Sequence, residues 1–193
     1  EVPLKQYLCQ CLLQQNGNRV KKSLIIYSSV DGHTEIISKK ISENLAHSHD
    51  VELIPLDKVK SKNLNDFDQI IIGASIRYGN YRKELFKFIE ENVGILSLKE
   101  NAFFSVNVVA RKEEKNNKDT NPYISKFLKN TKWSPKIIDV FAGVVDYPSY
   151  KYFDKFMIRL IMFITKGPTN TKKRYEFTDW NRVKKFSSLL DNQ

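Results

Sequence analysis

Short runs of apolar residues alternate along the chain with longer stretches in which apolar positions recur every three or four residues. A continuous apolar run bounded by polar residues is typical of a strand that is covered on both faces of a parallel sheet. Five such runs predict strands, at 24–27 (LIIY), 51–56, 69–75 (QIIIGAS), 102–110 (AFFSVNVVA) and 137–145 (IIDVFAGVV).

The stretches between these runs carry the helical period. One apolar stripe predicts a helix over about 35–45, and its members are Ile36, Ile37, Ile41 and Leu45. The same spacing predicts helices over about 83–93, 123–129 and 179–190. The polar segment 58–67 favours neither a helix nor a strand.

Strands that alternate with helices imply a parallel sheet, because parallel neighbours need a crossover connection between them. Five strands fit an α/β fold with a doubly wound sheet of order 2-1-3-4-5 and helices on both faces. Ligands of such folds bind at the carboxyl ends of the strands. The segments expected there are 28–34 (SSVDGHT), 75–81 (SIRYGNY), 107–112 (NVVARK) and 144–150 (VVDYPSY).

Charge narrows the range of partners. The 193 residues suit one domain with an insertion, and 32 Lys and Arg against 22 Asp and Glu give a net charge of +10. This excess favours an anionic partner such as nucleic acid, an acidic membrane surface or a carboxylate ligand, although it also serves solubility alone. No apolar run approaches the ~20 residues that span a bilayer.

The first twenty residues do not follow the pattern of the rest. We expect 1–20 to be a weakly ordered leader outside the domain, and 21–193 to form the domain. Cys9 and Cys11 are too few and too close for a disulfide framework, which indicates a reducing compartment. No further His or Cys lies near them in sequence, so we expect two spectator thiols and no metal site.

The loop SSVDGHT is rich in hydrogen-bond donors and lies between a predicted strand and a predicted helix. It lacks both the G-x-G-x-x-G of dinucleotide folds and the G-K-[ST] of a P-loop. It still suits a phosphate, because a helix N-terminus offers free N–H groups and Ser28, Ser29 and Thr34 add hydroxyls. The alternative is that Ser29, Asp31 or Thr34 merely caps the helix.

The second loop, GASIRYG (73–79), has the residues for a flat ligand. Small residues allow close approach, Tyr78 offers a ring for stacking and Arg77 offers a fixed cation. An ordinary strand-to-helix turn is the alternative. Since four such loops converge on one edge of the sheet, a site for a planar cofactor is favoured over four unrelated turns.

Several segments resemble a known family. SSVDGHT resembles the phosphate loop of flavodoxin-like proteins, which bind FMN. GASIRYGNY (73–81), SVNVVARKEEK (105–115), KFMIRLIM (155–162) and FTDW (177–180) look like segments of the menaquinone-dependent protoporphyrinogen IX dehydrogenases of bacteria. The resemblance runs from about Lys22 to Leu190 and leaves only the N-terminal segment uncovered.

This resemblance implies an FMN enzyme of haem biosynthesis. Its reaction would be the oxidation of protoporphyrinogen IX to protoporphyrin IX, six electrons in three two-electron steps, with menaquinone or ubiquinone as the acceptor. It further implies a peripheral protein on the cytoplasmic face of the bacterial inner membrane. The alternative is a flavodoxin-type FMN electron carrier, against which stand the basic charge and the extra segment after the fifth strand.

The resemblance also implies which residues hold FMN. The phosphate residues would be Ser28, Ser29, Val30, Asp31, Gly32, His33 and Thr34. The isoalloxazine ring would contact Ala74, Ser75, Ile76, Arg77, Tyr78 and Gly79 on one side, and Asn107, Val108, Val109, Ala110 and Arg111 on the other. We interpret His33 as a residue of the phosphate loop and not as a base.

No general base is evident. Arg77, Tyr78 and Arg111 are the candidates for a catalytic role, and Tyr78 and Asp146 lie near enough in the predicted loops to accept a proton, as water could. Because the substrate implied by the resemblance carries propionates, we expect cations at the mouth of the site. Arg77, Arg111 and Lys112 are the candidates for that contact.

The segment 146–176 exceeds what a five-stranded fold of this kind needs. Its helical face combines large apolar residues, broadened by Ile158, Met162 and Phe163, with flanking cations. This composition predicts contact with an anionic membrane surface and argues against nucleic acid; packing within the domain and a homo-oligomer interface are the alternatives. The predicted membrane residues are Phe153, Phe156, Met157, Leu160, Ile161 and Ile164, and the flanking cations are Lys151, Lys155, Arg159, Lys166, Lys172, Lys173 and Arg174.

Overall fold

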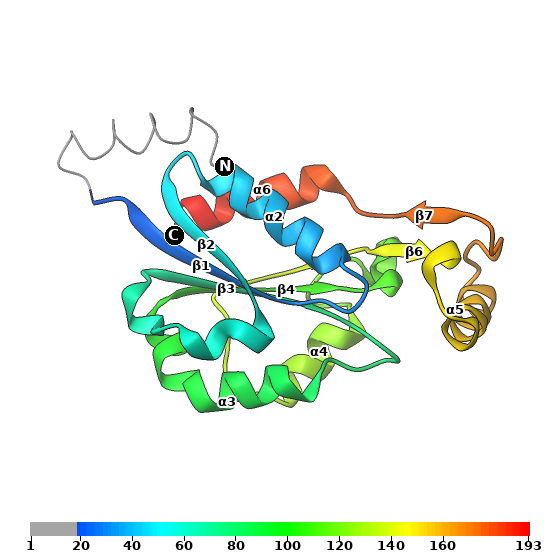
Figure 1. Ribbon diagram of the computed structural model, residues 1–193, viewed down its shortest axis with the longest axis horizontal. Coiled ribbons are helices and arrows are strands. Elements are labelled where there is room, and N and C mark those ends of the chain that lie inside the picture. Colours follow the sequence, from blue (N-terminus) through cyan, green and yellow to red (C-terminus); the bar gives the residue numbers. More distant parts are fainter. Residues whose placement is uncertain (1–18) are drawn as a thin grey trace.

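The computed structural model describes residues 19–193, with the side chain of Ser61 left out, as a parallel sheet between two layers of helices (Figure 1). Most of the predicted leader, including Cys9 and Cys11, lies outside the described residues. The predictions made for 1–18 therefore stay predictions.

The sheet has five parallel strands in the order β2-β1-β3-β4-β5, which confirms the predicted fold class and strand order. Every neighbouring pair runs parallel. In this spatial order the strands are His49–Pro55 (β2), Lys21–Ser28 (β1), Gln69–Ser75 (β3), Glu100–Val106 (β4) and Ile137–Phe141 (β5).

Helices cover both faces of the sheet, as Figure 1 shows. One face is covered by α2 (His33–Leu45) and α6 (Trp180–Asp191), and the other by α3 (Lys83–Leu98) and α4 (Pro122–Lys129). Each face of the sheet has its own hydrophobic core, and successive side chains of β1 point to opposite faces. Ile25 packs with residues of α2 and α6, whereas Leu24 and Ile26 pack with residues of α3 and α4. The polar segment 58–67 forms parts of two 3₁₀ helices, Leu56–Ser61 and Leu64–Asp66.

Two predicted strands are shorter in the structure, and one predicted helix is longer. β4 ends at Val106, because the Asn107 side chain accepts a hydrogen bond from the Ala110 N–H and starts a 3₁₀ helix, Val108–Arg111. A further 3₁₀ turn, Glu113–Lys115, follows it. α3 extends past the predicted end at 93 to Leu98.

The predicted fifth strand, 137–145, is wrong as one strand. β5 ends at Phe141, and 144–146 form a separate strand β6 (Val144–Asp146) that pairs antiparallel with β7 (Arg174–Glu176). The carbonyls at the break are bonded elsewhere: that of Ala142 accepts from the Thr178 hydroxyl, and that of Gly143 accepts from the Phe177 N–H. The chain that returns from the insertion thus replaces the continuation of the sheet.

The insertion forms a subdomain beyond the carboxyl ends of the strands (Figure 1). It consists of the β6–β7 pair, a 3₁₀ turn (Tyr147–Ser149) and the helix α5 (Tyr152–Ile164). Val145, Tyr147 and Met162 form its small buried core. Within residues 19–193, no helix is long and apolar enough to cross a membrane.

Candidate functional site

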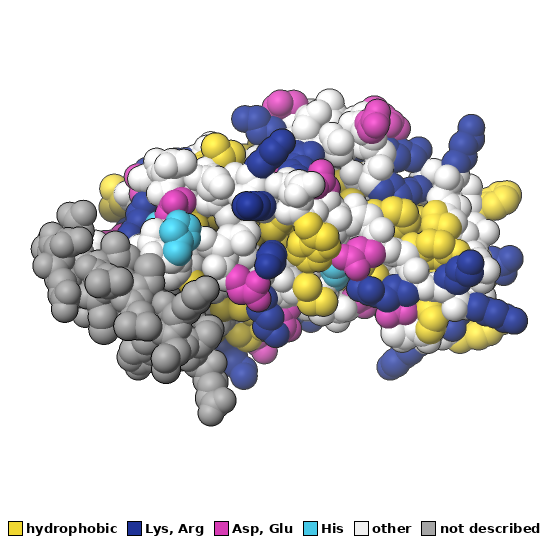
Figure 2. All heavy atoms as spheres, turned by 90° about the horizontal axis from the view of Figure 1, so that it is seen from above, with side chains coloured by type: hydrophobic (Ala, Val, Ile, Leu, Met, Phe, Trp, Pro, Cys, Tyr) yellow, Lys and Arg dark blue, Asp and Glu magenta, His cyan; other side chains and the backbone are white. Residues whose placement is uncertain are grey.

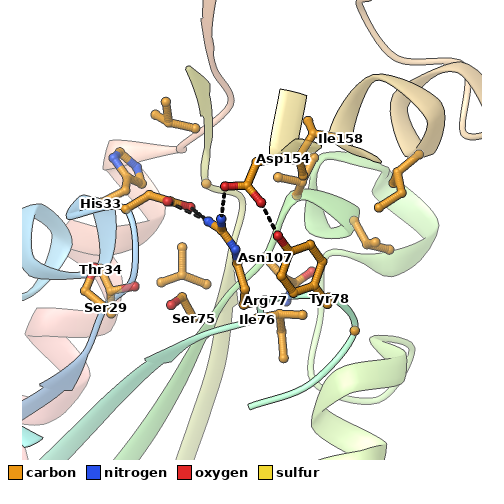
Figure 3. Close-up of a pocket in the computed structure, with 18 of the residues that line it drawn as sticks. Ser29, His33, Thr34, Ser75, Ile76, Arg77, Tyr78, Asn107, Asp154 and Ile158 are labelled. Carbon is orange, nitrogen blue, oxygen red and sulfur yellow. Dashed lines mark hydrogen bonds and ion pairs between the residues drawn. The ribbon is translucent and has the colours of Figure 1, made fainter. Parts of the chain in front are cut away.

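A cleft lies where the loops after β1, β3 and β4 meet the helix α5 (Figure 3). Of the residues predicted for a cofactor, those that line it are Ser29, Asp31, His33, Thr34, Ser75, Ile76, Arg77, Tyr78, Gly79, Asn107, Val108 and Val109. Those outside the lining are Ser28, Val30, Gly32, Ala74, Ala110 and Arg111. The sheet therefore brings all four predicted segments to one cleft, the first three through most of their predicted residues and the fourth, 144–150, through Val144 and Tyr150.

The first wall of the cleft is the loop between β1 and α2. Gly32 stands at the N-cap of α2 with φ = 80°, a conformation that favours glycine, and its side-chain-free backbone lets the chain turn into the helix. Across residues 19–193, four buried side-chain N or O atoms have no hydrogen-bond partner, and three belong to this loop: Ser29 Oγ, His33 Nδ1 and Thr34 Oγ1. Buried polar groups are otherwise almost always paired.

This pattern decides between the two interpretations of the loop. A capping role would bond Ser29, Asp31 or Thr34 to the first N–H groups of α2, but the two hydroxyls have no partner and the Asp31 carboxylate binds Arg77 instead. Buried hydroxyls beside the free N–H groups of a helix N-terminus are suited to a phosphate. The residues present therefore fit the phosphate group of FMN.

His33 ties this loop to the end of the insertion. Its Nε2 lies 2.6 Å from Thr178 Oγ1, and the Thr178 hydroxyl donates its one proton to the carbonyl of Ala142. The hydroxyl can then only accept from the ring, so Nε2 carries the proton. Burial lowers the pKa of His33, which favours the neutral ring.

The second wall is a tight turn after β3. Backbone hydrogen bonds join Arg77 and Asn80 in both directions, with Tyr78 (φ = 48°) and Gly79 (φ = 76°) in the left-handed region between them. Positive φ at both central positions is the geometry of a type I′ turn. Lys126 of α4 binds the Gly79 carbonyl at 3.1 Å and Asn80 Oδ1 at 2.6 Å, which holds the turn against the core.

Arg77 lies between two carboxylates at the mouth of the cleft, as Figure 3 shows. One terminal nitrogen binds the Asp31 carboxylate at 2.7 and 2.9 Å, and the other lies 2.8 Å from Asp154 Oδ2 on α5. The Tyr78 hydroxyl donates to Asp154 Oδ1. The hydrogen bond from Tyr78, together with the charge of Arg77, lowers the pKa of Asp154.

Asn107 forms the third wall and is fully engaged in hydrogen bonds. Its side chain donates to Ser105 Oγ at 3.1 Å, and its Oδ1 accepts from the Ala110 N–H at 3.1 Å and from Asn121 Nδ2 at 3.3 Å. This network fixes Val108 and Val109 where they line the cleft. The wall is therefore apolar on its surface and polar behind it.

Arg111 and Ala110 take other positions than predicted. The Arg111 guanidinium binds the carbonyl of Val108 and both the carbonyl and the hydroxyl of Thr165, so it holds the C-terminal end of α5. Burial lowers the pKa of Arg111. Arg111 lies outside the lining of the cleft, and its predicted contact with a ligand stays a prediction.

The insertion supplies cleft residues that sequence reasoning did not assign. Tyr150, Asp154, Met157, Ile158 and Ile161 all line the cleft. Burial raises the pKa of Tyr150 to about 12. One signal could have indicated Asp154, since it is the single acid in a helix of apolar and basic residues. The face of α5 that meets the cleft gives no such signal, because apolar residues also occupy the faces beside it.

Comparisons with known proteins agree with this geometry. A family model described as a flavodoxin domain matches residues 24–172. The chain is 40% identical to the quinone protoporphyrinogen IX dehydrogenase of Escherichia coli K12 over 167 residues, which cover 86% of this chain and 92% of that protein. It is also 40% identical to the protein of that name from Leishmania major, over 86% of this chain and 73% of the relative.

Solved structures give the same fold. The oxidised flavodoxin 1 of Bacillus cereus matches with a TM-score of 0.51 and 14% sequence identity, over 90% of this chain and 99% of that one. Identity at this level speaks for the fold alone. The family model and the identity to the dehydrogenases together show that this chain belongs to the flavodoxin-domain family of quinone-dependent protoporphyrinogen IX dehydrogenases.

Proposed function

We propose that this protein binds FMN and oxidises protoporphyrinogen IX to protoporphyrin IX with a quinone as electron acceptor. The single observation that carries the cofactor is the pair of unpartnered buried hydroxyls, Ser29 Oγ and Thr34 Oγ1, at the head of α2. The relatives' names supply the reaction, and six electrons leave the substrate in three two-electron steps.

The residues of the cleft have separate tasks in this reaction. Ser29 and Thr34 hold the phosphate, while Tyr78 and the apolar wall at Val108 and Val109 bound the space for the flat ring. FMN, when bound, supplies the acceptor for the electron pair of each step. Met157, Ile158 and Ile161 of α5 cover the cleft and exclude water from it.

We further propose that α5 binds the anionic surface of the membrane, on the cytoplasmic face of the bacterial inner membrane. Large apolar side chains of α5 stand exposed at helical spacing, among them Phe153 (66% exposed), Phe156 (60%), Phe163 (73%) and Ile164 (69%). Figure 2 shows yellow side chains lying among dark blue Lys and Arg at this end of the molecule. A basic amphipathic helix of this kind is suited to the membrane interface.

Burial and the cleft lining lead us to propose a narrower membrane face than the sequence alone suggests. Met157 and Ile161, predicted as membrane residues, line the cleft, and Met162 is buried in the core of the insertion. Phe163 lies with the exposed residues instead. The proposed membrane face is therefore Phe153, Phe156, Leu160, Phe163 and Ile164.

An anaerobic assay tests the reaction. Purified FMN-loaded protein receives protoporphyrinogen IX and menaquinone, and porphyrin fluorescence is followed against a control without protein. We expect fluorescence to rise with turnover that depends on quinone. Bound FMN without fluorescence above the control would contradict the dehydrogenase proposal and favour an electron carrier.

Vesicle co-sedimentation tests the membrane proposal. We expect the protein to pellet with anionic vesicles at low salt and to stay in the supernatant with neutral ones, because several cations flank α5. Replacing Phe156 and Leu160 with Glu should abolish pelleting, whereas Leu98→Glu, at a still more exposed leucine at the end of α3, should not. Equal pelleting of all three proteins would contradict the proposal.

A further inference from the structure

The mouth of the cleft contains a binding site for a carboxylate that a carboxylate of the protein occupies. Arg77 donates to one oxygen of Asp154 and Tyr78 donates to the other, so two neighbouring residues hold the two oxygens of one carboxylate. Figure 3 shows the three side chains turned toward one another above the cleft. Paired charge-assisted donors of this kind are how proteins recognise a carboxylate.

We propose that Asp154 stands in for a carboxylate of the substrate, and that an amphipathic tetrapyrrole carboxylate displaces it from Arg77 and Tyr78 when it binds. The inference rests on the proposed function for the identity of the ligand. The second carboxylate on Arg77, that of Asp31, contacts the other terminal nitrogen, so displacement of Asp154 does not require this ion pair to break.

The two ends of α5 differ, and Asp154 lies at the end with fewer buried contacts. The C-terminal end is fixed by buried Met162 and by the bonds from Arg111 to Thr165. In the first turn, Tyr152 is 92% exposed and Phe153 is 66% exposed. Because Arg77 and Tyr78 hold the two oxygens of one side chain, displacement of Asp154 would free both donors at once.

An internal carboxylate also makes the site selective. Because Asp154 is tethered beside Arg77 and Tyr78, its effective concentration there is far above that of a free small carboxylate. A competing ligand must gain additional contacts, and the apolar side chains next to the site, Met157 and Ile158, offer them. A large apolar ring with a carboxylate arm has both features, whereas acetate or a free amino acid has only one.

The experiment compares two forms of one porphyrin on the FMN-loaded full chain. Protoporphyrin IX carries free carboxylates and its dimethyl ester does not, and the affinity of each is measured by quenching of porphyrin fluorescence. We expect Asp154→Asn to bind the free acid roughly three- to tenfold more tightly than the wild-type protein and the ester equally well. Arg77→Gln and Tyr78→Phe should weaken the free acid and spare the ester.

Asp57→Asn is the matched control, since it changes the net charge by the same amount at an exposed position far along the chain from this site. Far-UV circular dichroism and FMN content verify that each variant is folded and loaded. Unchanged or weaker binding of the free acid by Asp154→Asn, an equal gain for the ester, or no porphyrin binding by any variant would each overturn the inference. If instead the proposed function is wrong, the wild-type protein will show no turnover in the anaerobic assay.

Discussion

The two ends of the sheet each bury a histidine together with hydroxyl groups, yet they use these groups differently. At the amino end, the Ser23 hydroxyl lies 2.7 Å from His49 Nδ1 and donates to Gln69 Oε1 at 3.0 Å. The Gln69 amide then donates to the Leu190 carbonyl at 2.8 Å and to Gln193 at 2.9 Å. This network is closed, and it fastens α6 to the sheet.

At the carboxyl end the corresponding network stays open. His33 is bonded through Nε2 only, and the hydroxyls of Ser29 and Thr34 have no partner. Leaving a buried polar group unpaired costs about 1–3 kcal/mol, so an open network lowers stability unless a ligand completes it. The difference teaches that similar residues stabilise the fold at one edge and are kept available for binding at the other.

Removing the unpaired hydroxyls of Ser29 and Thr34 should have the largest effect. It should weaken FMN binding without lowering the stability of the FMN-free protein. The double variant Ser29→Ala, Thr34→Val should lose about 3 kcal/mol of FMN binding, or roughly 100-fold in affinity, because two donors to a phosphate disappear. The free energy of unfolding of the FMN-free protein should not fall. Flavin fluorescence quenching and urea unfolding measure the two quantities.

Ser188→Ala is the control for the double variant, because this exposed serine donates to the Lys184 carbonyl away from the cleft. It should leave FMN affinity unchanged. Two results would contradict the comparison: wild-type FMN affinity in the double variant, or a clear loss of stability in its FMN-free form. Either would show that the hydroxyls at the carboxyl edge are not kept available for binding.

Breaking the closed network should have the opposite signature. Gln69→Ala should cost about 2–3 kcal/mol of unfolding free energy, because it leaves Ser23 Oγ and the Leu190 carbonyl buried with one partner fewer. FMN affinity should stay as in the wild-type protein. Gln193→Ala removes only the outer partner and should cost less than 1 kcal/mol; an equal loss for both variants would contradict this order.

Periodicity was enough to predict the fold and most of the cleft. The buried strands and the stripe of α2 are local patterns, and the carboxyl ends of parallel strands must share one edge, so Ser29, Thr34, Arg77 and Asn107 could be placed together. The strand breaks after Val106 and Phe141 could not be predicted, because they depend on bonds to side chains and on a return strand far along the chain.

The orientation of α5 was also beyond the sequence. The apolar residues of α5 extend over more than one side of the helix, so the apolar pattern alone could not sort Met157 and Phe163 between cleft and solvent. The partners of Arg111 were hidden for a related reason. A cation beside a predicted site suggests a ligand, but here backbone carbonyls at the end of α5 take its donors.

A smaller effect should follow when His33 Nε2, the one ring nitrogen of His33 that is hydrogen-bonded, loses its partner. Thr178→Val removes the hydroxyl that joins His33 Nε2 to the Ala142 carbonyl. We expect a loss of about 1 kcal/mol in stability and a few-fold loss in FMN affinity, since His33 is no longer held. Thr178→Ser keeps the hydroxyl and should restore both values; failure of this rescue would show that only the methyl group of Thr178 matters.

The smallest effect should be a pH dependence at the amino edge. Burial lowers the pKa of His49 below the value of about 6.5 that it has in the unfolded chain, so the unfolded state binds more protons. Stability should therefore be fully present above pH 6.5 and should fall as the pH drops from 6.5 toward the folded pKa. His49→Asn, which keeps a donor for Ser23 but does not titrate, should flatten this slope in urea unfolding at a series of pH values. Identical slopes in the wild-type protein and in His49→Asn would show that the closed network does not hold His49 in its neutral form.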